Sequence, residues 1–353
     1  MITKLILICK QILENQDNPV FQQRTANFQN MISLRCCSIQ ALSRFCLTIV
    51  LLITSFISLA QDLPVYNQYM LNRFLLNPAV VGSEKCNSMA ITDRHQWIGI
   101  AEAPYTQTFS FMARAKRKHG WGIILKNDQN GPNKNMGFQL SYAYHMTLNK
   151  RKVRKIAFGA SFLADYTTLD ESRFIDADGD PIITGAIITA FTPDANTGIY
   201  FYSRKMYAGI TIARLLPIAN AMYKSGKEPL KTRNYFLFIA RKFTSKKKKT
   251  VIEPSIVLKG TEKLLGQLDI NVKVSYLKHY WFAISYRRSI DMEASNPLSL
   301  QTYFGIKFEQ LTIAYAFDVG LTKIQYSNLG SHEVLIGYRF CREKSGAVPC
   351  PIF

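Results

Sequence analysis

Strict alternation of apolar and polar side chains marks the segment Leu268-Asp269-Ile270-Asn271-Val272-Lys273-Val274-Ser275-Tyr276. Every even-numbered position in this segment is apolar, and every odd-numbered position is polar. Successive side chains of a β-strand point to opposite faces of the sheet, so the pattern predicts a strand with one apolar and one polar face.

The same alternation recurs about fourteen times along the chain, in runs of about ten residues, and that length crosses a bilayer at the ~45° tilt of a barrel strand. The predicted strands lie near 88–97, 105–115, 119–128, 135–148, 154–165, 195–203, 206–213, 233–243, 251–260, 266–277, 280–288, 300–308, 311–318 and 332–340.

An open sheet of this size would expose unpaired edges, whereas closure into a barrel removes them. We therefore predict an all-β fold, a transmembrane antiparallel up-and-down β-barrel of about 14 strands. Its apolar face, rich in Tyr and Phe, would contact lipid, and its polar face would line a wet or plugged lumen. A soluble β-sandwich or propeller is the alternative. After the apolar run 45–60 no stretch reaches about 18 apolar residues, which excludes a polytopic helical membrane protein.

The run 45–60 follows two arginines and ends in small residues before Gln61, the layout of a secretory signal peptide cleaved between Ala60 and Gln61. An N-terminal membrane anchor is the alternative interpretation. Met31 offers a second start that would give a thirty-residue signal. The predicted organisation is a leader at 1–60, an N-terminal plug or periplasmic arm at 61–87, the outer-membrane barrel at 88–340 and a C-terminal periplasmic tail at 341–353.

The connections after even-numbered strands are predicted to be short and to face the periplasm. The long connections 166–194, 214–232, 289–299 and 319–331 would then face outward. The chain carries a formal net charge of +20, and export rules out a nucleic-acid partner for it. Basic residues at the short turns would contact anionic outer-membrane lipids or dock an acidic periplasmic partner. They are Lys116, Arg117, Lys118, Arg151, Lys152, Lys246, Lys247, Lys248 and Lys249.

No pattern of residues points to catalysis, a cofactor or a metal. The five histidines lack metal-ligand spacing, and there is no phosphate-binding loop or nucleophile elbow. The segment 176–180 resembles the start of a calcium loop, but its glycine stands at the fourth position instead of the sixth, so we expect a turn. We expect no enzyme, although a barrel enzyme with residues drawn from separate strands is a rival hypothesis.

Three cysteines follow the leader. In the oxidising envelope, Cys341 and Cys350 could close a small loop after the last strand, and Cys86 would then remain free.

Short motifs fill roughly the first seventy residues after the leader. They include Gln68, Tyr69, Met70, Asn72, Asn77, Pro78, Ala79, Gly82, Gln96, Trp97, Pro104, Thr106, Gln107, Asn127, Asp128, Gly131 and Pro132. In this order they resemble the PorP/SprF family of type IX secretion system outer-membrane proteins. The first thirty residues have no counterpart in the family pattern.

The resemblance implies a non-enzymatic, multi-pass outer-membrane barrel of a didermic bacterium, without a cofactor. Such proteins assist export or surface attachment of adhesins and other cargo proteins with a type IX C-terminal domain, in gliding motility and related processes. Some also contact a periplasmic peptidoglycan-binding lipoprotein. The rival function is an outer-membrane channel for small or apolar solutes.

The segment 61–87 is too irregular for a membrane strand, because Pro64, Pro78 and Gly82 interrupt regular structure. Its apolar residues, among them Tyr69 and Phe74, require burial. We therefore predict that it packs in the lumen or across the periplasmic mouth, with an arm on the periplasmic rim as the alternative. A filled lumen would favour partner binding over free diffusion.

Overall fold

The computed structural model describes residues 67–115, 118–149, 153–173, 185–216, 232–247, 249–261, 265–290 and 297–340. Its strands are β1 (Asn87–His95), β2 (Tyr105–Arg114), β3 (His119–Asn130), β4 (Asn133–Asn149), β5 (Arg154–Asp170), β6 (Ile187–Tyr202), β7 (Met206–Ala213), β8 (Asn234–Arg241), β9 (Phe243–Thr244), β10 (Thr250–Thr261), β11 (Leu265–Tyr276), β12 (Tyr280–Ser289), β13 (Pro297–Phe308), β14 (Leu311–Gly320) and β15 (Ser331–Phe340).

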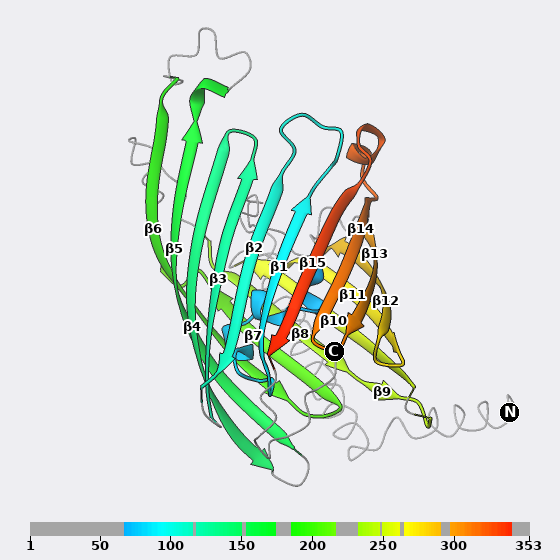
Figure 1. Cartoon of the computed structure of the whole chain (residues 1–353). Helices are drawn as coiled ribbons and strands as arrows, with labels where there is room; N and C mark the ends of the chain where they lie inside the picture. The colour runs from blue at the N-terminus through cyan, green and yellow to red at the C-terminus, as the bar shows by residue number, and fades with distance from the viewer. Residues whose placement is uncertain are drawn as a thin grey trace, which may run out of the picture. The chain divides into compact units, whose positions relative to one another are not determined.

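These strands form a closed antiparallel barrel of 14 strands plus one extra strand, which confirms the predicted fold class (Figure 1). Strands that follow one another in sequence pair, except that β8 and β9 both pair with β10. β1 closes the barrel against β15, with Asn87 opposite Phe340. The extra strand β9 continues β8 in the same register along β10, because Ala240 lies opposite Ser255 and Thr244 opposite Val251. Among the described residues, no helix is long and apolar enough to cross a membrane.

The barrel has an apolar outer surface and a polar interior. On β11, Ile270 and Val272 are 45% and 44% exposed, whereas Asn271 and Lys273 between them are 0% and 2% exposed. The alternation of this strand therefore reports the two faces of the barrel wall, as predicted, and the exposed aliphatic face suits contact with lipid.

One predicted boundary is wrong. The connection expected at 166–194 is shorter, because β5 continues to Asp170 and β6 begins at Ile187, with these two residues paired. The extended arms are buttressed by Leu169 packed against Ala190. Pro193 lies within β6 opposite Ala164, and a proline that lacks an N–H makes such a stretch resemble a loop in sequence.

Residues 67–86, which we call the luminal segment, lie inside the barrel (Figure 1). They form three short 3-10 turns, η1 (Gln68–Met70), η2 (Arg73–Leu75) and η3 (Pro78–Val80). The remaining turns of this kind, η4 (Glu171–Arg173) and η5 (Lys323–Ser327), lie in connections between strands. Phe74, Val80 and Val81 are at most 2% exposed and belong to the main apolar cluster of the barrel interior.

Candidate functional site in the barrel lumen

Asn77 anchors the luminal segment to the barrel wall. Its side-chain Nδ2 donates to the backbone oxygens of Ile199 on β6 and Ile210 on β7, both at 3.0 Å. Its Oδ1 accepts a hydrogen bond from the backbone N–H of Ala79 at 2.8 Å, which caps η3. Pro78 follows at the first position of this turn, where a missing N–H costs nothing. The Asn-Pro-Ala motif therefore forms a cap and a wall anchor at once.

Glycines on the inner wall make room for this anchor. A Cβ at Gly159 of β5 would lie 2.6 Å from the carbonyl carbon of Pro78, and one at Gly198 of β6 would lie 2.9 Å from Cγ of Asn77. A Cβ at Gly122 of β3 would lie 2.8 Å from the ring of Phe74. Three strands thus lack side chains where the luminal segment lies against them. We call these glycines, with Gly120 on β3, the glycine track.

Gly120 of the glycine track faces Gly82 of the luminal segment. A Cβ at Gly82 would lie 2.6 Å from the Cα of Gly120, and Gly82 also adopts a φ of +74°, a conformation that favours glycine. The neighbouring Val81 carbonyl accepts a hydrogen bond from His145 Nε2 at 2.7 Å. The sequence motif therefore ends with a second close approach between segment and wall.

The start of the luminal segment contacts a buried cluster of charges. The backbone N–H of Asn67 donates to Glu333 at 3.1 Å and its Nδ2 donates to Asp318 at 3.1 Å. Arg94 lies 3.2 Å from each of these two carboxylates. Arg287 donates to Asn67 Oδ1 at 3.2 Å. The carboxylates of the wall that contact this end of the segment are therefore also paired with Arg94 of the wall.

Tyr69 forms the next contact along the segment. Its hydroxyl lies 2.9 Å from Asp269 Oδ2 and 3.1 Å from Asn271 Oδ1 on β11. Burial, together with the Asp269 charge, raises the pKa of the Tyr69 phenol well above its ordinary value, so the hydroxyl keeps the proton that it donates. Asp269 also accepts two hydrogen bonds from Arg287 at 3.0 and 2.9 Å.

A second charge cluster lies where strands β7, β10 and β11 meet the segment. Glu253 accepts a hydrogen bond from the Tyr207 hydroxyl at 2.7 Å and lies 3.6 Å from the ammonium groups of both Lys242 and Lys273. The guanidinium of Arg73 stacks over the Tyr207 ring at 4.3 Å. These contacts hold η2 against the wall through an aromatic ring.

Glu84 lies near the end of the luminal segment, and its buried carboxylate is 3.8 Å from the guanidinium of Arg73. Burial raises the pKa of the Glu84 carboxyl above its ordinary value. The positive charges of Arg73, Arg339, Lys242 and Lys307 oppose this rise and offset only part of it. The docked segment consequently binds a proton at Glu84 more readily than a solvated segment would.

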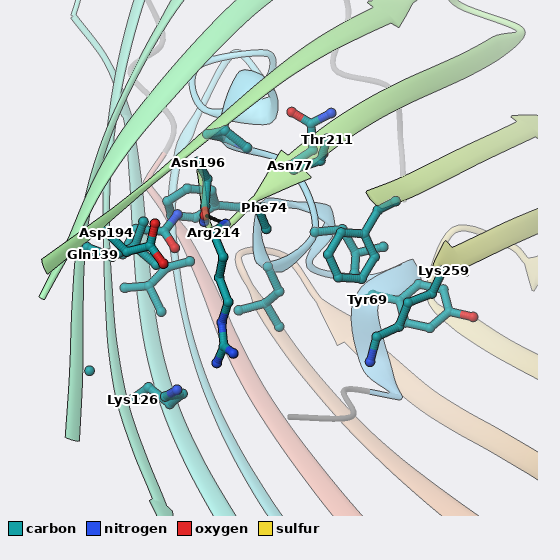
Figure 2. A pocket seen from close by; sticks show the side chains of 18 of the residues that line it. Tyr69, Phe74, Asn77, Lys126, Gln139, Asp194, Asn196, Thr211, Arg214 and Lys259 are labelled. Carbon is teal, nitrogen blue, oxygen red and sulfur yellow. Dashed lines mark hydrogen bonds between the residues drawn. The ribbon is translucent and has the colours of Figure 1, made fainter. Parts of the chain in front are cut away.

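A cavity of about 120 Å³ lies beside the luminal segment and is bounded by strands β3 to β12. Figure 2 shows Tyr69, Phe74 and Asn77 of the segment beside the basic side chains of Lys126, Arg214 and Lys259. The cavity therefore combines an apolar boundary from the segment with a charged boundary from the strands. Its full lining also includes Leu75, Leu76, Pro78, Ile124, Gly137, Phe138, Gln139, Leu163, Asp165, Asp194, Asn196, Thr211, Ala213, Phe236, Val257, Gln267, Asp269 and Arg287.

The remaining motif residues gather at the end of the barrel where β1 joins β2. Asn127 donates to Gln107 at 3.3 Å, the N–H of Gln96 donates to the Pro104 carbonyl at 2.9 Å, and the N–H of Trp97 donates to Ser331 at 3.2 Å. Thr106 donates to Asp128, Gly131 adopts a φ of +56°, and the Pro132 carbonyl accepts from Asp170.

The structure thus brings the motif residues into two groups. Tyr69, Met70, Asn72, Asn77, Pro78, Ala79 and Gly82 lie in the lumen, where Met70 is buried and Asn72 donates to Ser110 at 2.7 Å. Gln68 belongs to η1, but its side chain is not among those described. The second group ties the β1–β2 connection to β3 and β15.

The basic turn residues that the structure describes are exposed at the opposite end of the barrel. They are Lys118, Lys246, Lys247 and Lys249. Lys116, Arg117, Arg151, Lys152 and Lys248 lie outside the described residues, as do the cleavage site at Ala60 and Gln61 and the segment 176–180.

Cys86 is disulfide-bonded, so the expectation that it remains free is wrong. It directly precedes β1, which pairs with the last strand of the closed barrel, so closure brings it to the C-terminal end of β15. Cys341 and Cys350, the pair expected from sequence, lie outside the described residues.

No group of three or more His, Cys, Asp or Glu side chains in the described part of the chain is placed to hold a metal ion.

Comparison with known families decides the identity. The profile of the family described as Type IX secretion system membrane protein PorP/SprF matches residues 58–338. The chain belongs to the PorP/SprF family. No curated protein matches the sequence.

Solved structures resemble this PorP/SprF barrel in fold alone. The KdgM porin is 10% identical, with 72% of this chain and 99% of the porin covered and a TM-score of 0.35. The CymD monoaromatic hydrocarbon channel is 11% identical, with 81% and 95% covered and a TM-score of 0.46. BamA from Haemophilus ducreyi lacking POTRA domains 1-3 is 6% identical, with 73% and 70% covered and a TM-score of 0.40. None of these likenesses supports a statement about function.

For a PorP/SprF member, the family supports a structural component of the type IX secretion system in the outer membrane and gives no indication of an enzyme. Sequence reasoning missed the glycine track and the luminal charges Glu253, Lys259 and Arg287. In the sequence, these residues could have been recognised only as glycines or charged residues on the polar face of a predicted strand, as Gly159 is on β5.

Proposed function

We propose that this PorP/SprF barrel is a non-enzymatic component of the type IX secretion system that assists export or surface attachment of cargo proteins, such as the adhesins of gliding bacteria. The observation that carries the proposal is the luminal segment, which occupies the barrel interior. A lumen filled by anchored chain favours a protein that holds partners over one that passes solutes by free diffusion.

The proposed orientation follows from the ends of the barrel. A signal peptide cleaved between Ala60 and Gln61 directs the chain across the inner membrane. The end that carries Lys118, Lys246, Lys247 and Lys249 then faces the periplasm, and the β1–β2 connection faces outward. Short turns at one end and longer connections at the other support this assignment.

Cargo meets the outward end in this proposal. The extended β5–β6 arms lie there, as do the ends of β7 and β8 at Ala213 and Asn234, and they form the docking region for a secreted protein with a type IX C-terminal domain. The second group of motif residues fixes the base of the neighbouring β1–β2 connection, so its role is to hold the outward rim in one shape.

The periplasmic end meets an envelope partner. Exposed lysines attract an acidic surface, and attraction between exposed charges weakens as salt screens it. A peptidoglycan-binding lipoprotein with an acidic face fits this role. The competing interpretation is that the same lysines contact anionic lipid head groups.

A gentle detergent pull-down of a tagged copy from outer membranes, with bound proteins identified by mass spectrometry, tests the proposal. Recovery of a large surface protein and a periplasmic lipoprotein supports it. The triple variant Lys246→Gln, Lys247→Gln, Lys249→Gln should lose the lipoprotein and keep the cargo. The matched control changes exposed lysines at the outward end, Lys134→Gln and Lys323→Gln, and should keep the lipoprotein.

A solute channel is the alternative function. It requires ligand-dependent conductance of the purified barrel in planar bilayers. A wild-type barrel that recovers no secretion partner and shows ligand-dependent conductance would replace our proposal with this one.

A further inference from the structure

The cavity beside the luminal segment contains more positive than negative charge. Its basic lining residues are Lys126, Arg214, Lys259 and Arg287, and its acidic ones are Asp165, Asp194 and Asp269. The contacts that these charged side chains form with other described residues differ from one residue to the next.

One cation of the lining pairs with a carboxylate. Arg287 and Asp269 form the two-pronged pair already described. Lys126 and Asp165 both border Gly137, whose added Cβ would lie 3.1 Å from the Lys126 Cε and 2.8 Å from Asp165 Oδ1. The missing side chain at Gly137 leaves room for both side chains beside β4, although the two form no ion pair among the described residues.

One carboxylate oxygen of Asp194 binds backbone groups. Its Oδ1 accepts hydrogen bonds from the backbone N–H groups of Ala195 at 2.7 Å and Leu216 at 3.1 Å. The aspartate therefore holds the turn that follows β7.

Lys259 is a buried cation of the lining without such a pair. It is only 5% exposed, yet the ion pairs and hydrogen bonds formed among the described residues do not include its ammonium group. The charges that act on it are those of Arg287, Asp269 and Arg214, and Arg287 already engages Asp269. A buried ammonium surrounded by excess positive charge favours the arrival of an anion.

The surroundings of Lys259 restrict the kind of anion. Its Nζ lies 6.0 Å from the Phe236 ring, and Phe74 and Val257 also line the cavity. Figure 2 shows the Lys259 and Arg214 side chains extending toward the space beside Tyr69 and Phe74 of the luminal segment. An apolar group can therefore lie against the aromatic rings while its charge meets the ammonium.

We propose that this cavity binds a carboxylate attached to a small apolar group, with Lys259 as the residue that contacts the carboxylate. The volume of about 120 Å³ admits a group of a few carbon atoms. Two sources share this chemistry, a free short-chain carboxylate and the C-terminal carboxylate of a polypeptide that ends in an apolar residue. The site is independent of the proposed role in secretion, because it rests on the lining residues alone.

Calorimetric titration of the folded barrel in detergent tests the site. The probes are pentanoate with pentanamide as its uncharged control, and a short peptide ending in leucine with a free or an amidated C-terminus. Saturable binding of pentanoate identifies a free carboxylate as the ligand. Binding of the free-ended peptide alone identifies a chain terminus. Whichever acid binds should bind at least about tenfold more tightly than its amide.

The variant Lys259→Met removes the ammonium and keeps the length of the side chain, so binding should weaken by about tenfold or more. Lys126→Met is the matched control, because its cation lies in the same cavity beside Asp165, and it should retain binding. Heat-dependent mobility on gels confirms that each variant barrel is folded. Equal binding of acid and amide, equal affinity in Lys259→Met, or no binding of either acid would overturn the proposal.

Discussion

A single methyl group at Gly159 should release the luminal segment without unfolding the barrel. In Gly159→Ala the new Cβ would lie 2.6 Å from the Pro78 carbonyl carbon. Carbon atoms in contact are separated by about 3.5 Å, so the backbone at Pro78 must retreat by about 1 Å. The atoms in contact are the backbone of the luminal segment and the backbone of β5, so no flexible side chain can move aside to make room.

The retreat breaks the anchor next to it. The two 3.0 Å hydrogen bonds from Asn77 to Ile199 and Ile210 would lengthen to about 4 Å, which is beyond hydrogen-bonding distance. Losing two such bonds destabilises docking by about 2 kcal/mol, and overpacking adds about 1–3 kcal/mol. A total near 4 kcal/mol corresponds to about a thousandfold larger population of undocked segment.

Trypsin cleavage after Arg73 measures this population, because Arg73 is 4% exposed in the docked segment. The Gly159→Ala barrel should be cut there much faster than the wild type, and it should show increased conductance in planar bilayers. The matched control is Gly337→Ala on β15, where the nearest atom to the new Cβ is 3.6 Å away and no displacement is needed. A Gly159→Ala barrel that stays folded, protected and closed would refute the reasoning.

Three further predictions follow from the contacts around the lumen. Cys86 directly precedes Asn87, which lies opposite Phe340 at the end of β15. We therefore predict that the next residue in sequence, Cys341, is its disulfide partner: peptide mapping without reductant should link Cys86 to Cys341, and a Cys341–Cys350 link would contradict this. Because the pKa of Glu84 is raised by burial, its contribution to stability is present below the ordinary carboxyl pKa and is lost as pH rises through the folded value. The thermal midpoint of the wild type relative to that of Glu84→Gln should therefore rise as pH falls toward the ordinary carboxyl pKa; a difference between the two that does not change with pH would contradict this. Asp269→Asn leaves Arg287 without its buried carboxylate and should lower the free energy of unfolding by about 3–5 kcal/mol, measured by urea titration, whereas pairing it with Arg287→Met should recover part of the loss; no recovery would show that the pair is not the cause.

The barrel could be predicted from sequence because alternation is a local property. Residues two positions apart in β11 lie on the same face, so the polar or apolar character of each residue's neighbours indicates its face. Asn271 and Lys273 were therefore assigned to the interior correctly. The arms of β5 and β6 show where this local reasoning fails. There the strands extend to Asp170 and Ile187 because these two residues pair with each other, which neither segment shows by itself. Pro193 also interrupts the strand-like pattern of residues within β6.

The lumen could be predicted only in part. The need to bury Tyr69 and Phe74 indicated an interior or periplasmic position for their segment, but the residues that receive them are distant in sequence. The sequence of β5 does not show why Gly159 is a glycine; the reason is the close approach of Pro78, which leaves no space for a Cβ. Cys86 was assigned wrongly for the same reason, because barrel closure, which pairs the first strand with the last, determines what lies beside it.

Most of the buried ion pairs among the described residues lie either within the barrel wall or within the luminal segment. The buried charges of the wall pair with one another across strands, Arg94 with Asp318 and Glu333, and Arg287 with Asp269. The segment's own buried charges, Arg73 and Glu84, form a pair within the segment. Between segment and wall the contacts include hydrogen bonds from neutral groups such as those of Asn67 and Tyr69, the stacking of Arg73 on an aromatic ring, and apolar packing. Charges also act across this boundary, because Arg339, Lys242 and Lys307 of the wall oppose the burial-driven rise in the pKa of Glu84. A partner that displaced the segment would therefore have to outweigh these charge interactions as well as the packing and the hydrogen bonds.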